Sequence, residues 1–212
     1  MSDDCCANGI DASGLETRHR RALASVLAIN VAAFLVMIVG AVLSGSSSLL
    51  SGTLDNLGDA LTYALSLAVI GSTASAKARV AFFKGLLIFA AALGVAAQIG
   101  WRLSNMETPV FETMGVAATL NLAANLICLR ILFPFRNDDL NMTSVWECSR
   151  NDIFDGLAVL TATVAVWVSD SAWPDLLIAI ALLIVFLRSA ARILSRSWRE
   201  LHAAPTPGPG TG

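Results

Sequence analysis

The chain carries unusually little charge. Only 14% of its 212 residues are charged and 56% are hydrophobic, whereas roughly a quarter of an ordinary soluble domain is charged. This shortage argues against a water-soluble domain and indicates lipid as the main solvent. The overall charge of −2 says little about partners, because segments that face lipid carry almost none of it. Nucleic acid is not an expected partner.

Cysteine is also scarce. Cys5 and Cys6 precede the first apolar segment, and Cys128 and Cys148 lie within later apolar segments. No disulfide framework is therefore implied. The adjacent pair near the N-terminus leaves two alternatives open, a solvated disordered tail or a collector of soft metal ions.

Long apolar windows dominate the rest of the sequence. Each is long enough to cross a hydrocarbon core of about 30 Å as a helix, and the first is longer than the core of a cleavable signal. They cover residues 22–43, 48–72, 80–101, 111–133, 142–168 and 173–194. We expect an all-α membrane protein with six transmembrane helices over residues 22–200. A cytoplasmic tail is expected at residues 1–21 and a disordered tail, rich in proline and glycine, at residues 201–212.

Tryptophan and the basic residues predict the orientation. All five tryptophans lie near proposed span ends, at the depth of the headgroup layer that tryptophan prefers. Of the 14 lysines and arginines, all but Arg102 and Arg150 map to one side. The positive-inside rule then makes both termini cytoplasmic, and we expect a multi-pass protein of the plasma (inner) membrane.

Five acidic residues lie inside the proposed spans. Asp55 and Asp59 belong to the second span, and Glu147, Asp152 and Asp155 to the fifth. A carboxylate near the bilayer centre costs about 2.5–3.5 kcal/mol. A proton, a cation or a partner charge must therefore compensate these groups.

The spacing in the second span places both acids on one face. Asp55 and Asp59 are four residues apart, so a helix separates them by roughly 6 Å along its axis, and they can share one ion. Gly52, Thr62 and Ser66 fall on the same face. This small and polar seam favours close packing against another helix.

The fifth span has a matching stripe. Cys148, Asn151, Asp152 and Asp155 follow the i, i+3, i+4, i+7 pattern of one helix face.

Glu147 and Arg150 are three residues apart near the cytoplasmic end of the fifth span. Pairing with each other or snorkelling to water is the preferred interpretation. The alternative is that Arg150 is a counter-charge that tunes the acidic site.

The two acidic stripes are predicted to meet. Asp59 lies about 16 Å from the outer end of its span and Asp152 about 15 Å from the inner end of its own. The two spans run antiparallel and hold equivalent places in two halves, spans one to three and four to six. An inverted repeat of this kind holds its substrate site at the interface of the halves.

The second span also resembles a known family. Residues 48–59 read Ser-Leu-Leu-Ser-Gly-Thr-Leu-Asp-Asn-Leu-Gly-Asp, similar to the Asp-x-x-x-Asp signature of the cation diffusion facilitators. The resemblance covers about residues 18–200. It implies six spans, cytoplasmic termini and a metal site with two ligands four apart from each of spans two and five. The family usually adds a cytoplasmic ferredoxin-like domain, and we expect a short member without it.

The fifth span departs from the family's His-x-x-x-Asp. The family pattern places Cys148 at the histidine and Asp152 at the aspartate, with Gly156 at a position that is often small. The metal ligands implied are thus Asp55, Asp59 and these two residues, with Asp155 as an acceptor behind them or a proton carrier. The competing register uses Asn151 with Asp155, although an amide is a poorer ligand.

This ligand set implies a transporter and not an enzyme. A thiolate favours Zn²⁺ or Cd²⁺, with Co²⁺ as a further alternative. Four anions around a dication leave two excess negative charges, so protons must compete with metal. We expect proton-coupled efflux without a bound cofactor. The expected partners are divalent metal ions, protons and the bilayer, with a homodimer through transmembrane helices as one alternative for the oligomeric state.

Two rival functions belong to other classes. A membrane-embedded metal-dependent enzyme such as a lipid phosphotransferase needs further ligands and a basic phosphate site, and no Asp-Gly with a following Ala-Arg occurs here. A proton channel or a membrane scaffold is the second rival.

Overall fold

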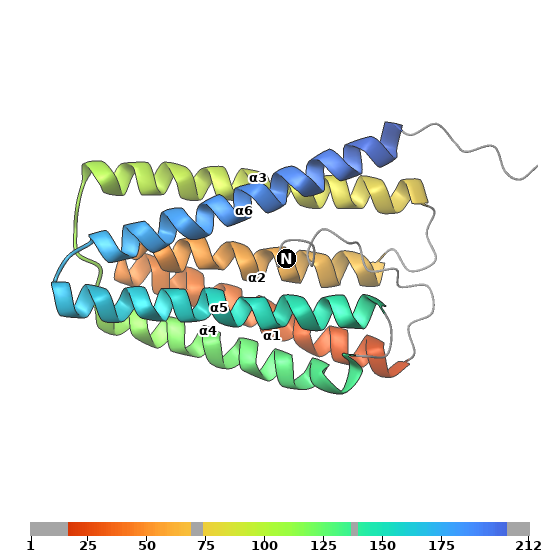
Figure 1. Ribbon diagram of the computed structural model, residues 1–212, viewed down its shortest axis with the longest axis horizontal. Helices are drawn as coiled ribbons and strands as arrows, with labels where there is room; N and C mark the ends of the chain where they lie inside the picture. Colours follow the sequence, from red (N-terminus) through yellow and green to blue (C-terminus); the bar gives the residue numbers. More distant parts are fainter. Residues whose placement is uncertain (1–16, 69–73, 137–139, 203–212) are drawn as a thin grey trace, which may run out of the picture.

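Long helices make up nearly all of the chain that the structure describes. The computed structural model describes residues 17–68, 74–136 and 140–202, which contain no strand (Figure 1). The elements are α1 (Thr17–Ser44), α2 (Ser47–Ala68), α3 (Ala74–Ser104), α4 (Phe111–Leu132), the short 3-10 helix η1 (Phe133–Phe135), α5 (Leu140–Ser169) and α6 (Trp173–His202). The predicted all-α membrane architecture is confirmed.

The helices extend beyond their apolar windows. α1 begins at Thr17 and α6 continues to His202. Polar residues therefore form the ends of both helices, outside their apolar windows. The tails predicted at residues 1–21 and 201–212 therefore overlap the helices by a few residues. Residues 1–16 and 203–212 lie outside the described residues.

Five helices of the described chain are long and apolar enough to cross a membrane. These stretches are Arg20–Ser44, Phe82–Ser104, Phe111–Phe135, Ser149–Ser169 and Trp173–Arg199. Over its described residues α2 is too polar for this criterion, because it carries Asp55, Asn56 and Asp59. α2 instead contacts all five of the other long helices, and most of residues 47–59 are buried, with Asp55 partly so. Its polar groups are thus shielded from lipid by protein.

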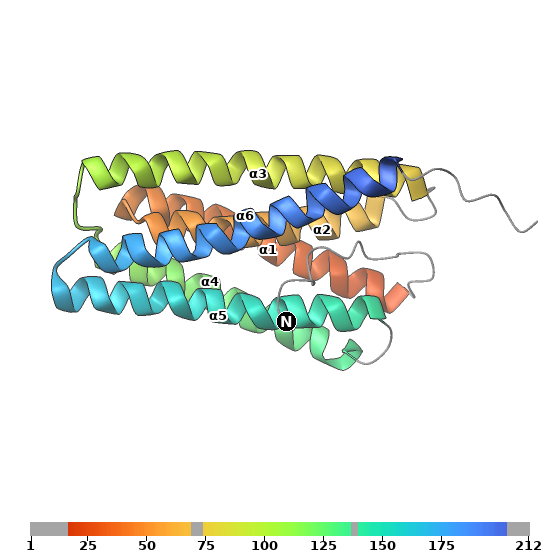
Figure 2. The same ribbon diagram turned by 45° about the horizontal axis from the view of Figure 1, so that its top comes forward.

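The packing follows the predicted division into two halves. α1 packs on α2 as α4 packs on α5, and α2 packs on α3 as α5 packs on α6. Each helix also contacts its equivalent in the other half, α1 with α4, α2 with α5 and α3 with α6. α3 and α6 lie against each other on one side of the bundle in both views (Figures 1 and 2).

Both described ends of the chain lie at the same end of the bundle (Figure 1). The opposite end, called here the Arg102 end, holds the connections α1–α2, α3–α4 and α5–α6. At the Arg102 end the helix-terminal tryptophans are Trp101, Trp167 and Trp173, all exposed. Trp146 and Trp198 lie toward the other end, so all five stand near helix ends, as predicted.

A glycine allows α1 and α4 to touch. A Cβ added at Gly40 would collide with the Cβ of Ala117. Any larger side chain at this position would force the two helices apart. Gly40 therefore maintains the contact between the first helices of the two halves.

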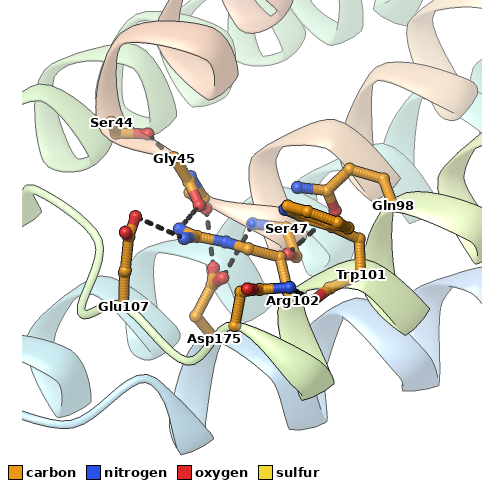
Figure 3. Close-up of polar contacts among 10 residues, drawn as sticks. Ser44, Gly45, Ser47, Gln98, Trp101, Arg102, Glu107 and Asp175 are labelled. Carbon is orange, nitrogen blue, oxygen red and sulfur yellow. Dashed lines mark hydrogen bonds and ion pairs between the residues drawn. The ribbon is translucent and has the colours of Figure 1, made fainter.

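Asp175, at the start of α6, caps the start of α2. Its carboxylate accepts hydrogen bonds from Ser46 Oγ (2.6 Å) and from the backbone N–H groups of Ser47 (2.7 Å) and Ser48 (3.0 Å). The first N–H groups of a helix lack partners within the helix and attract negative charge. This buried carboxylate therefore joins α6 to α2 at the Arg102 end (Figure 3).

Arg102 joins α3 to the same region. Its guanidinium donates to the backbone oxygen of Gly45, in the α1–α2 turn, and pairs with Glu107 at 3.4 Å (Figure 3). Gly45 has a φ of +69°, a conformation that glycine adopts without strain. Ser47 Oγ also donates to Gln98 Oε1 (3.1 Å) on α3. Polar bonds therefore fix α3 to the α1–α2 turn within the first half, and Asp175 joins this region to the second half.

We predict that Asp175→Ala destabilises the fold. The substitution leaves three donors without their carboxylate, so the free energy of unfolding should fall by about 2 kcal/mol. Unfolding of the protein in detergent micelles measures this change. Glu107→Ala is the control, because the Glu107 carboxylate is largely exposed and its ion pair should contribute less than about 1 kcal/mol. Equal stability of the Asp175 variant and the parent would contradict the capping role.

Candidate metal site

A polar layer crosses the bundle between two apolar clusters. The cluster nearer the Arg102 end comprises Met37, Ala41, Leu49, Met114, Ala117, Ala118, Val159, Ala162 and Leu182. The cluster nearer the other end comprises Leu23, Val26, Tyr63, Cys128 and Leu132. On α2, α4 and α5, the residues between these clusters include Asp55, Asn56, Asp59, Asn121, Asn125, Asp152 and Asp155. The acids predicted to lie near mid-membrane are therefore enclosed by apolar packing on both sides.

Asp55 and Asp152 connect α2 to α5. Their carboxyl groups lie close enough to interact with each other, and Asp152 is only 5% exposed. Two carboxylates this close repel each other, and a proton on one of them would allow a hydrogen bond between them. The predicted meeting of the second and fifth spans thus takes place at two neighbouring carboxyl groups.

Two further acids act on this pair. Asp155 and Asp59 both lie near Asp55. Asp59 is 2% exposed and its Oδ2 accepts a hydrogen bond from the Tyr63 hydroxyl at 3.1 Å. Asp155 is half-buried. A concentration of acidic groups in a poorly solvated layer favours the binding of a cation.

The structure does not test the complete predicted ligand set. Among the side chains that the structure describes, no three from histidine, cysteine, aspartate or glutamate converge as a metal site. Cys148 belongs to α5, but its side chain lies outside the described residues, as does that of Glu147. Cys5 and Cys6 lie outside them entirely. The choice between Cys148 and Asn151 as ligand therefore stays a prediction.

Small residues lie beside the acids, as predicted for both spans. A Cβ at Gly52 would lie 3.0 Å from Met37 Cε, and one at Gly156 would lie 3.3 Å from Leu122 Cδ1. Both glycines are buried, so the acidic segments of α2 and α5 pack closely on α1 and α4. The side chain of Ser66 lies outside the described residues.

Thr62, on the same predicted seam, is buried. Its hydroxyl donates to Gly58 O (2.6 Å) and accepts a hydrogen bond from Lys84 Nζ. The buried ammonium group of Lys84 therefore ties α3 to α2 one turn beyond Asp59.

Arg150 lies on the surface of the bundle. It is exposed, and its guanidinium carbon stands 5.3 Å from the centre of the Trp146 ring, a cation–π distance. This position fits the interpretation that the guanidinium reaches out of the span. It does not support a counter-charge among the acids.

Four neutral polar residues of the layer were not identified from the sequence. Asn56 Nδ2 donates to Asn121 Oδ1 at 2.8 Å, and Asn125 Nδ2 donates to the backbone oxygen of Asp152 at 3.4 Å. Asn30 Nδ2 lies 3.8 Å from Cys128 Sγ. The available signal was the pair Asn121 and Asn125, four residues apart inside an apolar span. Neither residue is ionisable, so charge within a span does not reveal the pair.

The chain is similar to known metal transport proteins. The model of a family described as the cation efflux transmembrane domain matches residues 23–202. The metal cation efflux system protein CzcD of Cupriavidus metallidurans is 26% identical over 200 residues. The cation efflux system protein CzcD of Alcaligenes sp. has the same identity. Both alignments cover 88% of this chain and 60% of the relative.

We predict that Tyr63→Phe weakens the metal-free fold through Asp59. The ring keeps its packing, but the buried carboxyl loses a donor, so the free energy of unfolding should fall by about 1–2 kcal/mol. Repeating the substitution in an Asp59→Ala background should reduce this loss by about 1 kcal/mol. Identical losses in both backgrounds would show that the hydrogen bond contributes nothing.

Proposed function

The chain belongs to the cation efflux family, the cation diffusion facilitators, and we propose that it exports divalent transition-metal ions in exchange for protons. The family model covers most of the chain, in agreement with the resemblance drawn from the Asp-x-x-x-Asp motif. The chain spans 60% of the length of the relatives it matches. The transport activity is therefore our proposal for this chain.

One observation links the proposal to particular residues. The carboxyl groups of Asp55 and Asp152 lie in contact between α2 and α5, within a layer closed by apolar clusters on both sides. Buried acids of this kind mark ion pathways in membrane proteins. We assign the metal substrate to Asp55, Asp59 and Asp152, completed by Cys148.

Zn²⁺ is the proposed substrate of first choice. A site with carboxylates alone would suit Mg²⁺ or Mn²⁺, whereas a thiolate ligand favours Zn²⁺ or Cd²⁺. Co²⁺ can adopt the same ligand set. In this proposal Cys148 therefore determines the metal preference.

Protons are the proposed exchange partner. The carboxyl pair of Asp55 and Asp152 holds a proton when no metal is bound, and a metal ion that takes both oxygens must displace it. Binding from the cytoplasm thus releases protons, and protons that enter from outside release the metal. Asp155 borders the pair and is our candidate for the proton carrier.

The orientation follows from the basic residues. Arg102 is a rare basic residue at its end of the bundle. Most of the positive charge lies at the opposite end, together with the described ends of the chain. The positive-inside rule then puts the Arg102 end outside. We propose a location in the plasma (inner) membrane with cytoplasmic termini and the bilayer as solvent. A homodimer through transmembrane helices is the alternative to a monomer.

The rival functions have weaker support. A lipid phosphotransferase needs a basic site for the phosphate group, whereas Arg150 is exposed beside Trp146, outside the acidic layer. A proton channel or scaffold does not require a paired acidic site of this kind. Membership of a metal transport family favours the exporter over both.

We predict that Asp55→Ala, Asp59→Ala and Asp152→Ala each abolish binding of Zn²⁺. Each removes an anionic ligand from one shared site, and removal of an acid that costs about 2.5–3.5 kcal/mol to insert should leave folding intact. Calorimetric titration of the purified protein measures affinity. Glu112→Ala, an exposed acid at the start of α4, should bind normally. Parental affinity in any of the three variants would refute the assignment.

A second set of variants decides which pair of α5 residues binds the metal, Cys148 with Asp152 or Asn151 with Asp155. Cys148→Ser should weaken Cd²⁺ and Zn²⁺ binding more than Co²⁺ binding, because a neutral hydroxyl replaces a soft thiolate, and Cys148→His should retain Zn²⁺ transport. Asn151→Ala should have little effect. Asp155→Asn should alter the pH dependence of transport in vesicles but not the metal preference. A silent Cys148→Ser together with loss of metal in Asp155→Asn would establish the other register.

A further inference from the structure

We infer that two asparagines of α4, Asn121 and Asn125, position the metal-binding segments of α2 and α5 relative to each other. Neither residue belongs to the proposed ligand set. This inference rests on the proposed function, because it concerns the geometry of the same site. It assigns to α4 the role of a template for the two helices that carry the ligands.

Asn121 holds the segment of α2. Its Oδ1 accepts a hydrogen bond from Asn56 Nδ2 at 2.8 Å, and Asn56 is the residue next to Asp55 in the chain. Both asparagines are buried, at 5% and 1% exposure. α2 contacts α4 less than it contacts the other helices, and this amide pair provides a directed polar bond between the two.

Asn125 holds the segment of α5. Its Nδ2 donates to the backbone oxygen of Asp152 at 3.4 Å, and Asn125 is only 2% exposed. The bond goes to the peptide group of a proposed ligand residue. It therefore fixes the backbone from which that carboxyl group extends.

Asn121 and Asn125 act together because they lie on the same face of α4. They are four residues apart, so their side chains stack along the helix about 6 Å from each other. α4 packs extensively on α5 and on α1, which in turn packs on α2. A rigid element thus lies beside both ligand helices and bonds to each at the level of the acids.

The environment makes these bonds specific. Where water is absent, an amide that loses its hydrogen-bond partner cannot bond to solvent instead. A shifted helix would therefore leave buried polar groups without partners. Asn56 Oδ1 already has no hydrogen-bond partner in the described chain. Sliding α2 along α4 would leave the whole Asn56 amide unbonded. The pair therefore favours one register, the one in which Asp55 meets Asp152.

The test is the metal affinity of leucine variants, which remove the amide with little change in volume. Asn121→Leu and Asn125→Leu should each weaken Zn²⁺ binding about 10- to 100-fold, the effect typical for residues that orient ligands. The visible absorption bands of bound Co²⁺ should also change, since they report ligand geometry and not stability. Calorimetry of the full chain in detergent provides the affinities.

The double variant Asn56→Leu/Asn121→Leu separates positioning from folding. It leaves no stranded amide, so it should fold even if the single variant does not, and it should still bind Zn²⁺ at least tenfold more weakly. Thr163→Val is the matched control, because the bond that the structure describes for this buried hydroxyl lies within α5, to Val159 O at 3.0 Å. Its affinity and its Co²⁺ spectrum should equal those of the parent.

Each outcome has a distinct meaning. Parental affinity and an unchanged Co²⁺ spectrum in the double variant would overturn the positioning role, whatever Asn121→Leu alone does. If Asp59→Ala loses Zn²⁺ while the leucine variants bind normally, the inference fails and the proposed site stands. If Asp59→Ala itself binds normally, the proposed site fails.

Discussion

A carboxylate buried in the middle of a membrane bundle must be compensated, and the interior of this protein is arranged around that requirement. Asp55 and Asp152 lie close together between α2 and α5, where one proton or one cation can compensate both, while Asp59 receives a hydrogen bond from Tyr63. Neutral amides occupy neighbouring positions on α2 and α4, and apolar clusters close the layer at both sides. In our proposal, the same groups that need compensation provide the oxygen ligands with which a divalent cation replaces a proton.

The position of α2 follows from the same constraint. A helix with two aspartates and an asparagine in its middle cannot face lipid, and α2 is accordingly surrounded by the other five long helices. Its start is fixed by Asp175, which caps it from α6 at the Arg102 end. Asp175 thus fixes the depth of the acidic segment in the bundle, and we infer that α4 fixes its position relative to α5. Transport would require the surrounding helices to move relative to this central helix without exposing the acids to lipid.

Much of this could be predicted from the sequence, because burial in lipid leaves strong patterns. Windows of about 20 apolar residues predict helices, and carboxylates inside them are so costly that Asp55, Asp59 and Asp152 stood out individually. The amide contacts of Asn121 and Asn125 left a weaker signal, since a neutral amide costs less to bury and its partner lies on another helix. The cap formed by Asp175 was missed because an acid at the start of a span resembles an ordinary solvated loop residue. The fourth ligand stays open because Cys148 and Asn151 lie on one face of the same helix, and periodicity alone cannot distinguish them.

We propose that metal and protons compete for one site between α2 and α5. Titrating the purified protein with Zn²⁺ in buffers with different ionisation enthalpies counts the protons released on binding. At least one proton should leave for each Zn²⁺ bound, because in this proposal the ion displaces a proton held between Asp55 and Asp152. Tight binding of Zn²⁺ with no proton release would rule out the competition.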